Sequence, residues 1–244
     1  PERSRIFQTL FPDERDLGGM LVLQAAKTSP LNFLKLEAGL FAGNGIKQDN
    51  DNRKDFIGHI SANRNLKDNI KLALGASYYG GSVYQGTANR YEMDGKSFVL
   101  NNDPANKGKY AKREYVGVDG QFVLISPLGM TQLRGEYLFG TQPGAKSGSK
   151  SPNAATLPNA DTYIRDFGGG YLMLVQDFGN LPFSAILKYD SYDPNVKVAG
   201  NEVGENGTDK GDVAFNTLGA GLLWRVNNNV RVQAYYDFVK NETS

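Results

Sequence analysis

The chain has 244 residues, of which 29 are glycine, one is histidine and none is cysteine. The lack of cysteine excludes a disulfide framework, a thiolate zinc site and a cysteine nucleophile. Basic and acidic residues nearly cancel to a net charge of +1, so no overall field favours nucleic acid or an anionic bilayer surface. A membrane-spanning helix needs about 20 mostly apolar residues in a row. Uncharged apolar stretches such as residues 171–175 are far shorter.

Alternating apolar and polar residues recur along most of the chain, in segments of about 9 to 12 residues. In residues 31–41, Leu34 and Leu36 are apolar, whereas Lys35 and Glu37 occupy the intervening positions. A period of two places apolar side chains on one face of a β-strand and polar side chains on the other, and no helix is required. In chain order, the predicted strands cover residues 19–27, 31–41, 55–63, 70–79, 116–124, 132–139, 163–177, 183–190, 212–226 and 230–238.

The connections between these strands alternate between short and long. Short turns rich in turn-forming residues are predicted at residues 28–30, 65–68, 126–129, 179–182 and 227–229. Long polar loops are predicted at residues 43–54, 85–109, 142–161 and 195–211. This alternation is typical of transmembrane β-barrels, which have tight turns at one rim and long loops at the other. We therefore predict an all-β fold, a transmembrane antiparallel β-barrel with about ten strands in this chain.

The last residues, 241–244, have the composition of a loop, whereas a membrane barrel usually finishes on a strand with a terminal aromatic residue. We expect residues 1–244 to form a single β-barrel domain that lacks strands at both ends and belongs to a larger porin barrel.

Aromatic residues gather near the predicted strand ends, which indicates interfacial girdles at two membrane surfaces. Cross-strand packing in a soluble β-core is the alternative explanation, and the position of the aromatics relative to the loops favours the girdles. Those toward the long loops are Tyr78, Tyr79, Tyr84, Tyr110, Tyr137, Phe139, Tyr189, Tyr192, Tyr236 and Phe238, and those near the short turns are Phe183 and Trp224.

If the apolar faces contact lipid, the polar faces line a lumen and form the functional surface. Rows of charged side chains give a hydrated pore a transverse field and local selectivity. Five basic and five acidic members indicate no preference for one sign, and the alternative is that they form ion-pair networks that hold the wall. The predicted pore-lining residues are Lys35, Glu37, Lys71, Asp119, Arg134, Glu136, Lys188, Asp190, Arg231 and Asp237.

Two stretches carry a resemblance to a known family. Residues 14–21, with the sequence ERDLGGML, open a predicted strand, and residues 229–238, NVRVQAYYDF, form the last one. Both are similar to strands of outer-membrane porins of the phosphate-selective porin O/P family, with the Bacteroidota branch as the nearest likeness. The likeness covers most of the chain loosely.

The resemblance implies a bacterial outer-membrane location and a sixteen-stranded, usually trimeric porin whose anion pathway uses a ladder of arginines. This chain is too short for sixteen strands, so the ladder cannot be transferred position by position. Arg15 is the one motif residue that we assign to anion binding. The implied partners are outer-membrane lipid, small hydrophilic or anionic solutes, further copies in a homotrimer and another outer-membrane protein, but no nucleic acid.

An enzymatic barrel is a competing hypothesis. His59 and Ser61 lie two residues apart on one strand face and Asn63 follows, which resembles the His-x-Ser arrangement of outer-membrane phospholipase A. That enzyme acts toward the lipid, whereas the alternation turns His59 and Ser61 inward. Phosphate-loop, paired-histidine and Gly-x-Ser-x-Gly signatures are missing from the sequence. We therefore expect no enzymatic activity, no cofactor and no metal.

A secreted all-β binding module of carbohydrate or adhesin type is the alternative from another class, because its strands also alternate and bury one face in a sandwich. A sandwich would be soluble without detergent, whereas a barrel with a lipid-facing apolar band would not. The sequence favours a porin for passive diffusion of small hydrophilic, including phosphate-like anionic, solutes. The transported solute, the full strand number, the oligomeric state and the role of the long loops stay open.

Overall fold

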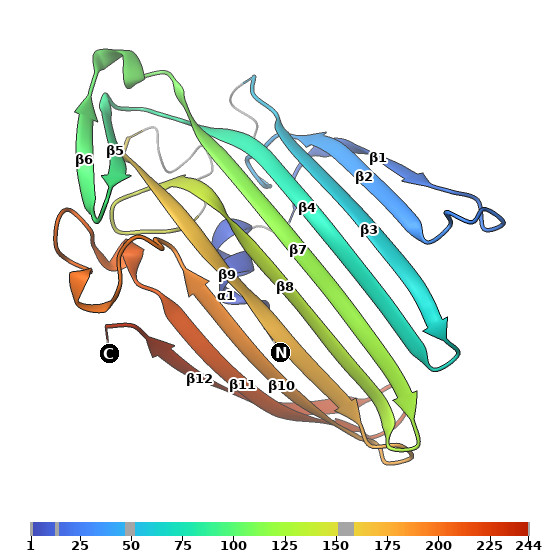
Figure 1. The fold of residues 1–244 in the computed structure, drawn as a ribbon. Coiled ribbons are helices and arrows are strands. Elements are labelled where there is room, and N and C mark those ends of the chain that lie inside the picture. The colour runs from blue at the N-terminus through green and yellow to red at the C-terminus, as the bar shows by residue number, and fades with distance from the viewer. Residues whose placement is uncertain (1, 13–14, 47–51, 151–158, 244) are drawn as a thin grey trace.

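The computed structural model describes residues 2–12, 15–46, 52–150 and 159–243, and most of them belong to one large β-sheet. Ten strands follow one another across the sheet, each antiparallel to the next, as Figure 1 shows. In sheet order they are β1 (Gly18–Gln24), β2 (Leu34–Phe41), β3 (Asp55–Lys67), β4 (Ile70–Tyr84), β7 (Tyr110–Ser126), β8 (Gly129–Gly144), β9 (Thr162–Asp177), β10 (Phe183–Asp193), β11 (Phe215–Arg225) and β12 (Arg231–Asn241). The predicted all-β antiparallel fold with about ten strands is confirmed.

The sheet is curved and open. Strand order begins at β1 and ends at β12, and these two edge strands do not pair with each other within the described residues. The sheet curves around the short helix α1 (Arg5–Leu10), which lies on its concave side (Figure 1). In the described part of the chain, no helix is both long and apolar enough to cross a membrane.

The loops are sorted between the two ends of the sheet. Connections 68–69, 127–128, 178–182 and 226–230 lie at one end, together with residues 25–33. The longer connections 42–54, 85–109, 145–161 and 194–214 lie at the other, although residues 47–51 and 151–158 fall outside the described residues. Because antiparallel neighbours reverse direction at every turn, this sorting follows directly from the alternation of short and long segments in the sequence.

The turn between β7 and β8 illustrates why one of these connections is so tight. Gly129 has a φ of +113°, in a region that L-residues rarely adopt. A Cβ atom there would overlap the carbonyl oxygen of Asp177 on neighbouring β9. Only glycine therefore allows β8 to begin after a connection of just two residues, 127–128.

Two regions of the chain differ from the prediction, the long connection after β4 and the N-terminal segment. Residues 85–109 were expected to be a loop, but they contain a hairpin of β5 (Asn89–Asp94) and β6 (Ser97–Asn102), followed by the 3-10 turn η1 (Pro104–Asn106). β5 also runs parallel to the start of β9, through pairs such as Tyr91 with Tyr163. Short 3-10 turns η2 (Gly200–Glu202) and η3 (Lys210–Asp212) lie in the connection from β10 to β11.

Helix α1 is the second difference, since no helix was expected. Ile6, Phe7, Leu10 and Phe11 recur at the spacing of one helical face, a short pattern that was not identified from the sequence. A six-residue helix is marginal in isolation. Its apolar face is held instead by the concave side of the sheet, where Ile6 and Leu10 are buried.

The core beneath α1 is an aromatic cluster on the middle strands. Tyr79 and Tyr115 stack with ring centroids 5.0 Å apart, and Phe167 meets Tyr115 edge-on at 5.0 Å. Phe11 of the N-terminal segment completes the cluster, with its ring 5.8 Å from Tyr79. Edge-to-face and offset stacked pairs at these separations are favourable beyond the area they bury. The concave face therefore has an apolar region around α1.

Candidate functional site

All ten predicted pore-lining residues lie on the concave, inner face of the sheet. Strand register establishes this, because Tyr79 and Tyr115 face α1 and residues at even spacing from them share that face. Asp119 is four residues from Tyr115 on β7, and it pairs with Glu136 on β8. The same rule places the remaining eight on the inner face: Lys35, Glu37, Lys71, Arg134, Lys188, Asp190, Arg231 and Asp237.

Some of these residues pair with one another. Lys35 Nζ lies 2.7 Å from Glu37 Oε1 on β2, and Lys188 Nζ lies 3.0 Å from Asp190 Oδ2 on β10. Each pair is two residues apart on one strand face, so the alternation brings the two charges together. These four residues match the alternative in which lumenal charges form ion pairs along the wall.

Lys188 and Asp190 also hold the N-terminal segment against the wall. The Lys188 ammonium donates to the backbone oxygen of Glu2 at 3.1 Å. The backbone N–H of Arg5 donates to both carboxylate oxygens of Asp190, at 3.3 and 3.2 Å. Both side chains are less than a tenth exposed, so their charges are directed at α1 rather than at open solvent.

Five of the ten make no ion pair with any other described residue, and they do not form one cluster. Lys71 lies near the short-turn end of β4, and Arg231 and Asp237 lie on edge strand β12. Arg134 and Glu136 lie on β8 near the middle of the sheet. These residues share one face of the sheet, as alternation predicts, but the sequence gave no information on which of them would form ion pairs.

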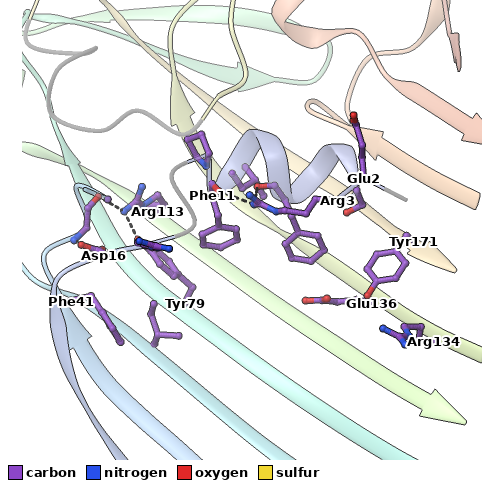
Figure 2. Close-up of a pocket in the computed structure, with 18 of the residues that line it drawn as sticks. Glu2, Arg3, Phe11, Asp16, Phe41, Tyr79, Arg113, Arg134, Glu136 and Tyr171 are labelled. Atoms are coloured by element: carbon purple, nitrogen blue, oxygen red, sulfur yellow. Dashed lines mark hydrogen bonds between the residues drawn. The ribbon is translucent and has the colours of Figure 1, made fainter. Parts of the chain in front are cut away.

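A cavity of about 870 Å³ lies between α1 and the inner face. Figure 2 shows Arg134, Glu136 and Tyr171 together at one end of it, and Asp16, Phe41 and Arg113 at the other. Most side chains between these ends are apolar, because the residues that pack α1 against the wall also line the cavity. The sequence did not predict this cavity, since α1 was not expected.

One end of the cavity is closed by a buried ion pair. Arg113 on β7 bonds to Asp55 on β3 and to the hydroxyl of Tyr79 on β4, which lies between them. Tyr79 in turn donates to Asp55, and both charged side chains are about 5% exposed or less. A buried pair needs such additional hydrogen bonds to offset the loss of hydration. The three residues therefore fix the relative positions of β3, β4 and β7.

Arg15, the predicted anion-binding residue, lines the same cavity and its side chain is exposed. Its neighbour Asp16 accepts a hydrogen bond of 2.8 Å from the backbone N–H of Gly43. Partial burial raises the pKa of Asp16 despite this bond. Glu14, the first residue of the family-like stretch, lies outside the described residues. Arg15 and Arg134 thus border one cavity, although they are far apart in sequence.

His59 lies between two carboxylates on the inner face. Its Nε2 is 3.0 Å from Asp119 Oδ2, and its Nδ1 is 3.4 Å from Glu37 Oε2. The contact to Asp119 reaches across Gly75 on β4, where a Cβ would collide with both side chains. Ser61 shares this face, but the hydrogen bonds of His59 go to carboxylates. A polar residue with partners, the simpler explanation for a lone histidine, fits this geometry.

Among the described residues, no group of three or more histidine, cysteine, aspartate or glutamate side chains could hold a metal ion. The inner face provides charged groups without an ion-pair partner among the described residues, and an apolar cavity.

Comparisons with known proteins found no matching family model, no matching curated protein and no matching solved structure.

Proposed function

We propose that this chain forms part of a β-barrel porin of the bacterial outer membrane, which provides a water-filled path for passive diffusion of small hydrophilic solutes, including anions. The apolar outer face contacts lipid in this proposal, and the inner face contacts the diffusing solute. Further copies in a homotrimer, or another outer-membrane protein, are the proposed protein partners.

The contrast between the two faces of the sheet carries this proposal. On the outer face, cross-strand neighbours from β8 to β12 form the uncharged row Leu133, Leu174, Leu187, Ala220 and Tyr236. Large outer side chains such as Leu187 and Leu218 remain about half exposed. Contiguous apolar surface of this extent is rare on soluble monomers. Lipid would cover it, and the charged inner face would meet water.

The arrangement of layers supports a barrel over the soluble sandwich. A sandwich needs a second sheet packed on the apolar face. Here all twelve strands of the described residues belong to one sheet, and the only helix longer than a 3-10 turn lies on the opposite, inner face. The sorting of short and long loops to opposite ends supports the same conclusion, because membrane barrels have short turns at one rim.

Phosphate selectivity, as in the porin O/P family, is a narrower proposal that rests on the two family-like stretches. Arg15 lies at the cavity, which is compatible with a role in anion passage. The ten predicted pore-lining residues carry no net charge in total, so their number alone favours neither anions nor cations. Selectivity would depend on which charges a solute meets in the narrowest part of the path.

Conductance measurement tests the proposed function. The full-length protein is extracted in detergent, inserted in a planar bilayer and recorded in a salt gradient. We expect detergent-dependent solubility and stepwise ohmic conductance. Folded protein without conductance would contradict the channel, and solubility without detergent would favour the sandwich.

Charge-removing variants connect the conductance to the inner face. Lys71→Gln is expected to shift the reversal potential toward cation selectivity, because Lys71 has no ion-pair partner among the described residues. Lys240→Gln on the outer face of β12 is the matched control, and it should leave the reversal potential unchanged. Equal shifts from both variants would contradict the assignment of the inner face as the lumen.

A further inference from the structure

The cavity under α1 has a composition that the diffusion of hydrophilic solutes does not require. Apolar and aromatic side chains make up much of its wall, among them Phe7, Phe11, Ile57, Tyr171 and Met173. A volume of about 870 Å³ falls in the range of small-molecule sites, which combine a mostly apolar wall with a few placed polar groups. Inorganic phosphate has no apolar surface to bury, so this wall would contribute nothing to holding it.

Arg134 carries a positive charge at the cavity that no described residue neutralises. Arg134 donates to the neutral side chain of Gln132 and makes no ion pair with a described residue. Its Nε is buried and has no hydrogen-bond partner. A guanidinium has five N–H donors in a planar fork, which matches the two oxygens of a carboxylate. Arg134 thus retains both charge and donors for an anionic ligand.

Three other cations around the cavity already have acceptors, whereas Arg15 lines it with an exposed side chain. Arg113 bonds to Asp55 and Tyr79, and Arg3 donates to the backbone oxygens of Phe7 and Phe11 at 2.7 and 2.8 Å. Lys188 is paired with Asp190. This distribution distinguishes Arg134 from its basic neighbours.

Apolar and aromatic surface lies directly beside Arg134. Met173 on β9 is its cross-strand neighbour, and Lys188 on β10 is the next in the same row. Tyr171 is two residues from Met173 on the same face. The ring of Phe7 meets the ring of Tyr171 edge-on at a centroid distance of 6.3 Å. Figure 2 shows Tyr171 and Arg134 at the same end of the cavity. A ligand held by Arg134 would therefore contact this aromatic pair.

We propose that this cavity binds small organic carboxylates with an aromatic or apolar body, with Arg134 pairing with the carboxylate and Phe7, Tyr171 and Met173 contacting the body. As a statement about the transported solute, this rests on the proposed channel. The anions that the cavity prefers are then aromatic carboxylates rather than inorganic phosphate. Binding is expected to be weak, on the order of 1 mM, because a solute in a channel must also leave.

Glu136 supplies a second, opposite test. It lies two residues from Arg134 on the same face and lines the same end of the cavity, and no ion pair joins the two. When ionised, its carboxylate repels an anion that binds beside it. Removing this charge should therefore strengthen binding of a carboxylate, whereas removing that of Arg134 should weaken it.

Isothermal titration calorimetry of the detergent-solubilised full-length protein tests the ligand class. The probes are benzoate, acetate, benzyl alcohol and inorganic phosphate, titrated separately. We expect benzoate to bind more tightly than acetate, which lacks the ring, and than benzyl alcohol, which lacks the charge. Phosphate binding as tight as that of benzoate would overturn the proposal.

Variants identify the groups responsible. Arg134→Gln should weaken benzoate binding by about tenfold and leave benzyl alcohol unchanged, whereas Glu136→Gln should strengthen benzoate binding. Tyr171→Leu should reduce the preference for benzoate over acetate. Arg64→Gln, which removes the same charge from the outer face of β3, is the matched control and should bind benzoate like the unmodified chain. Equal loss in Arg134→Gln and Arg64→Gln would overturn the assignment.

Conductance of the same preparations separates this proposal from the proposed function. Benzoate binding without conductance would contradict the channel and leave the ligand class supported. Conductance without benzoate binding would overturn the ligand class and leave the channel supported. Block of chloride current by benzoate, lost in Arg134→Gln, would support both.

Discussion

The same strands present two very different surfaces on their two sides. On β10, Leu187 and Tyr189 face outward and are about half exposed, whereas Lys188 and Asp190 face inward and are nearly covered. Exposure and polarity are therefore the reverse of those in a soluble domain, where apolar side chains are buried. In the proposed porin, lipid covers the apolar outer face, whereas the charged inner face is covered by partners within the chain, such as the N-terminal segment on Lys188 and Asp190.

The inner face is itself divided into two regions. Around α1 it is aromatic and closely packed, and a buried ion pair holds its edge. Below α1, toward the short turns, charged residues such as Lys71 and Arg134 have no ionic partner among the described residues. The first region gives the curved sheet a core, and in the proposed porin the second contacts the diffusing solute.

The largest expected effect comes from the buried ion pair. Arg113→Met leaves the carboxylate of Asp55 buried and uncompensated, so we expect the free energy of unfolding to fall by about 3–5 kcal/mol. Denaturant unfolding of the detergent-solubilised protein measures this loss. The control Lys112→Met removes a charge at the adjacent, exposed position and should change the stability little. Equal losses of unfolding free energy in both variants would show that burial on the inner face does not make Arg113 more important for stability than Lys112 on the outer face.

The outer face is tested by introducing a charge. Leu218→Arg on β11 should lower stability in a bilayer by about 2–4 kcal/mol if this residue contacts the lipid midplane. Its neighbour Thr217 faces inward, so Thr217→Arg should cost less than about 1 kcal/mol. Unfolding in lipid vesicles gives both values. A larger cost for Thr217→Arg than for Leu218→Arg would reverse the assignment of the two faces.

A smaller effect is expected from the packing of α1. Leu10→Ala opens space in the buried cluster under the helix, and we expect a loss of about 2–3 kcal/mol in detergent. Leu222→Ala removes the same atoms from the exposed outer face and should cost much less, because detergent or lipid remains in contact with alanine. If the two losses were equal in chemical denaturation, α1 would not be packed as described.

The smallest effect is a pH dependence in the long loops, outside both faces. Lys96 in the β5–β6 turn bonds to Glu202, which lowers the pKa of the Glu202 carboxyl. A lowered pKa means that the ionised form stabilises the folded loop. This stabilisation is present above the ordinary pKa of a glutamate and is lost as the pH falls through the lowered value.

Hydrogen exchange at residues 199–208 measures this loss of loop stability. Protection should decrease on acidification in the unmodified chain, and Glu202→Gln should be less protected at neutral pH and show a weaker dependence. Glu205→Gln is the control at an exposed neighbouring position and should keep the dependence. Unchanged protection in Glu202→Gln would mean that the pair with Lys96 does not order the loop.

Local patterns were sufficient to predict the ten strands that follow one another across the sheet, but they missed the hairpin of β5 and β6. Alternation identified the strand that became β10 and separated Lys188 and Asp190 from Leu187 and Tyr189. The girdle assignment was wrong for Tyr79 and Tyr192, which lie buried on the inner face. That assignment used their position near strand ends, whereas alternation places Tyr79 on the face of Lys71 and Tyr192 on the face of Lys188.

By itself, the sequence determined the all-β character, the strand order and the polarity of each face, because a period of two and turn-forming residues act over a few neighbours. Only the tertiary structure decided that the N-terminal segment folds as α1 against the concave face and that Asp55 and Arg113 pair across β4. It also decided that Arg134 borders a cavity with no ionic partner among the described residues. These contacts join residues far apart in the chain. No local pattern specifies them, since each depends on the curvature of the whole sheet.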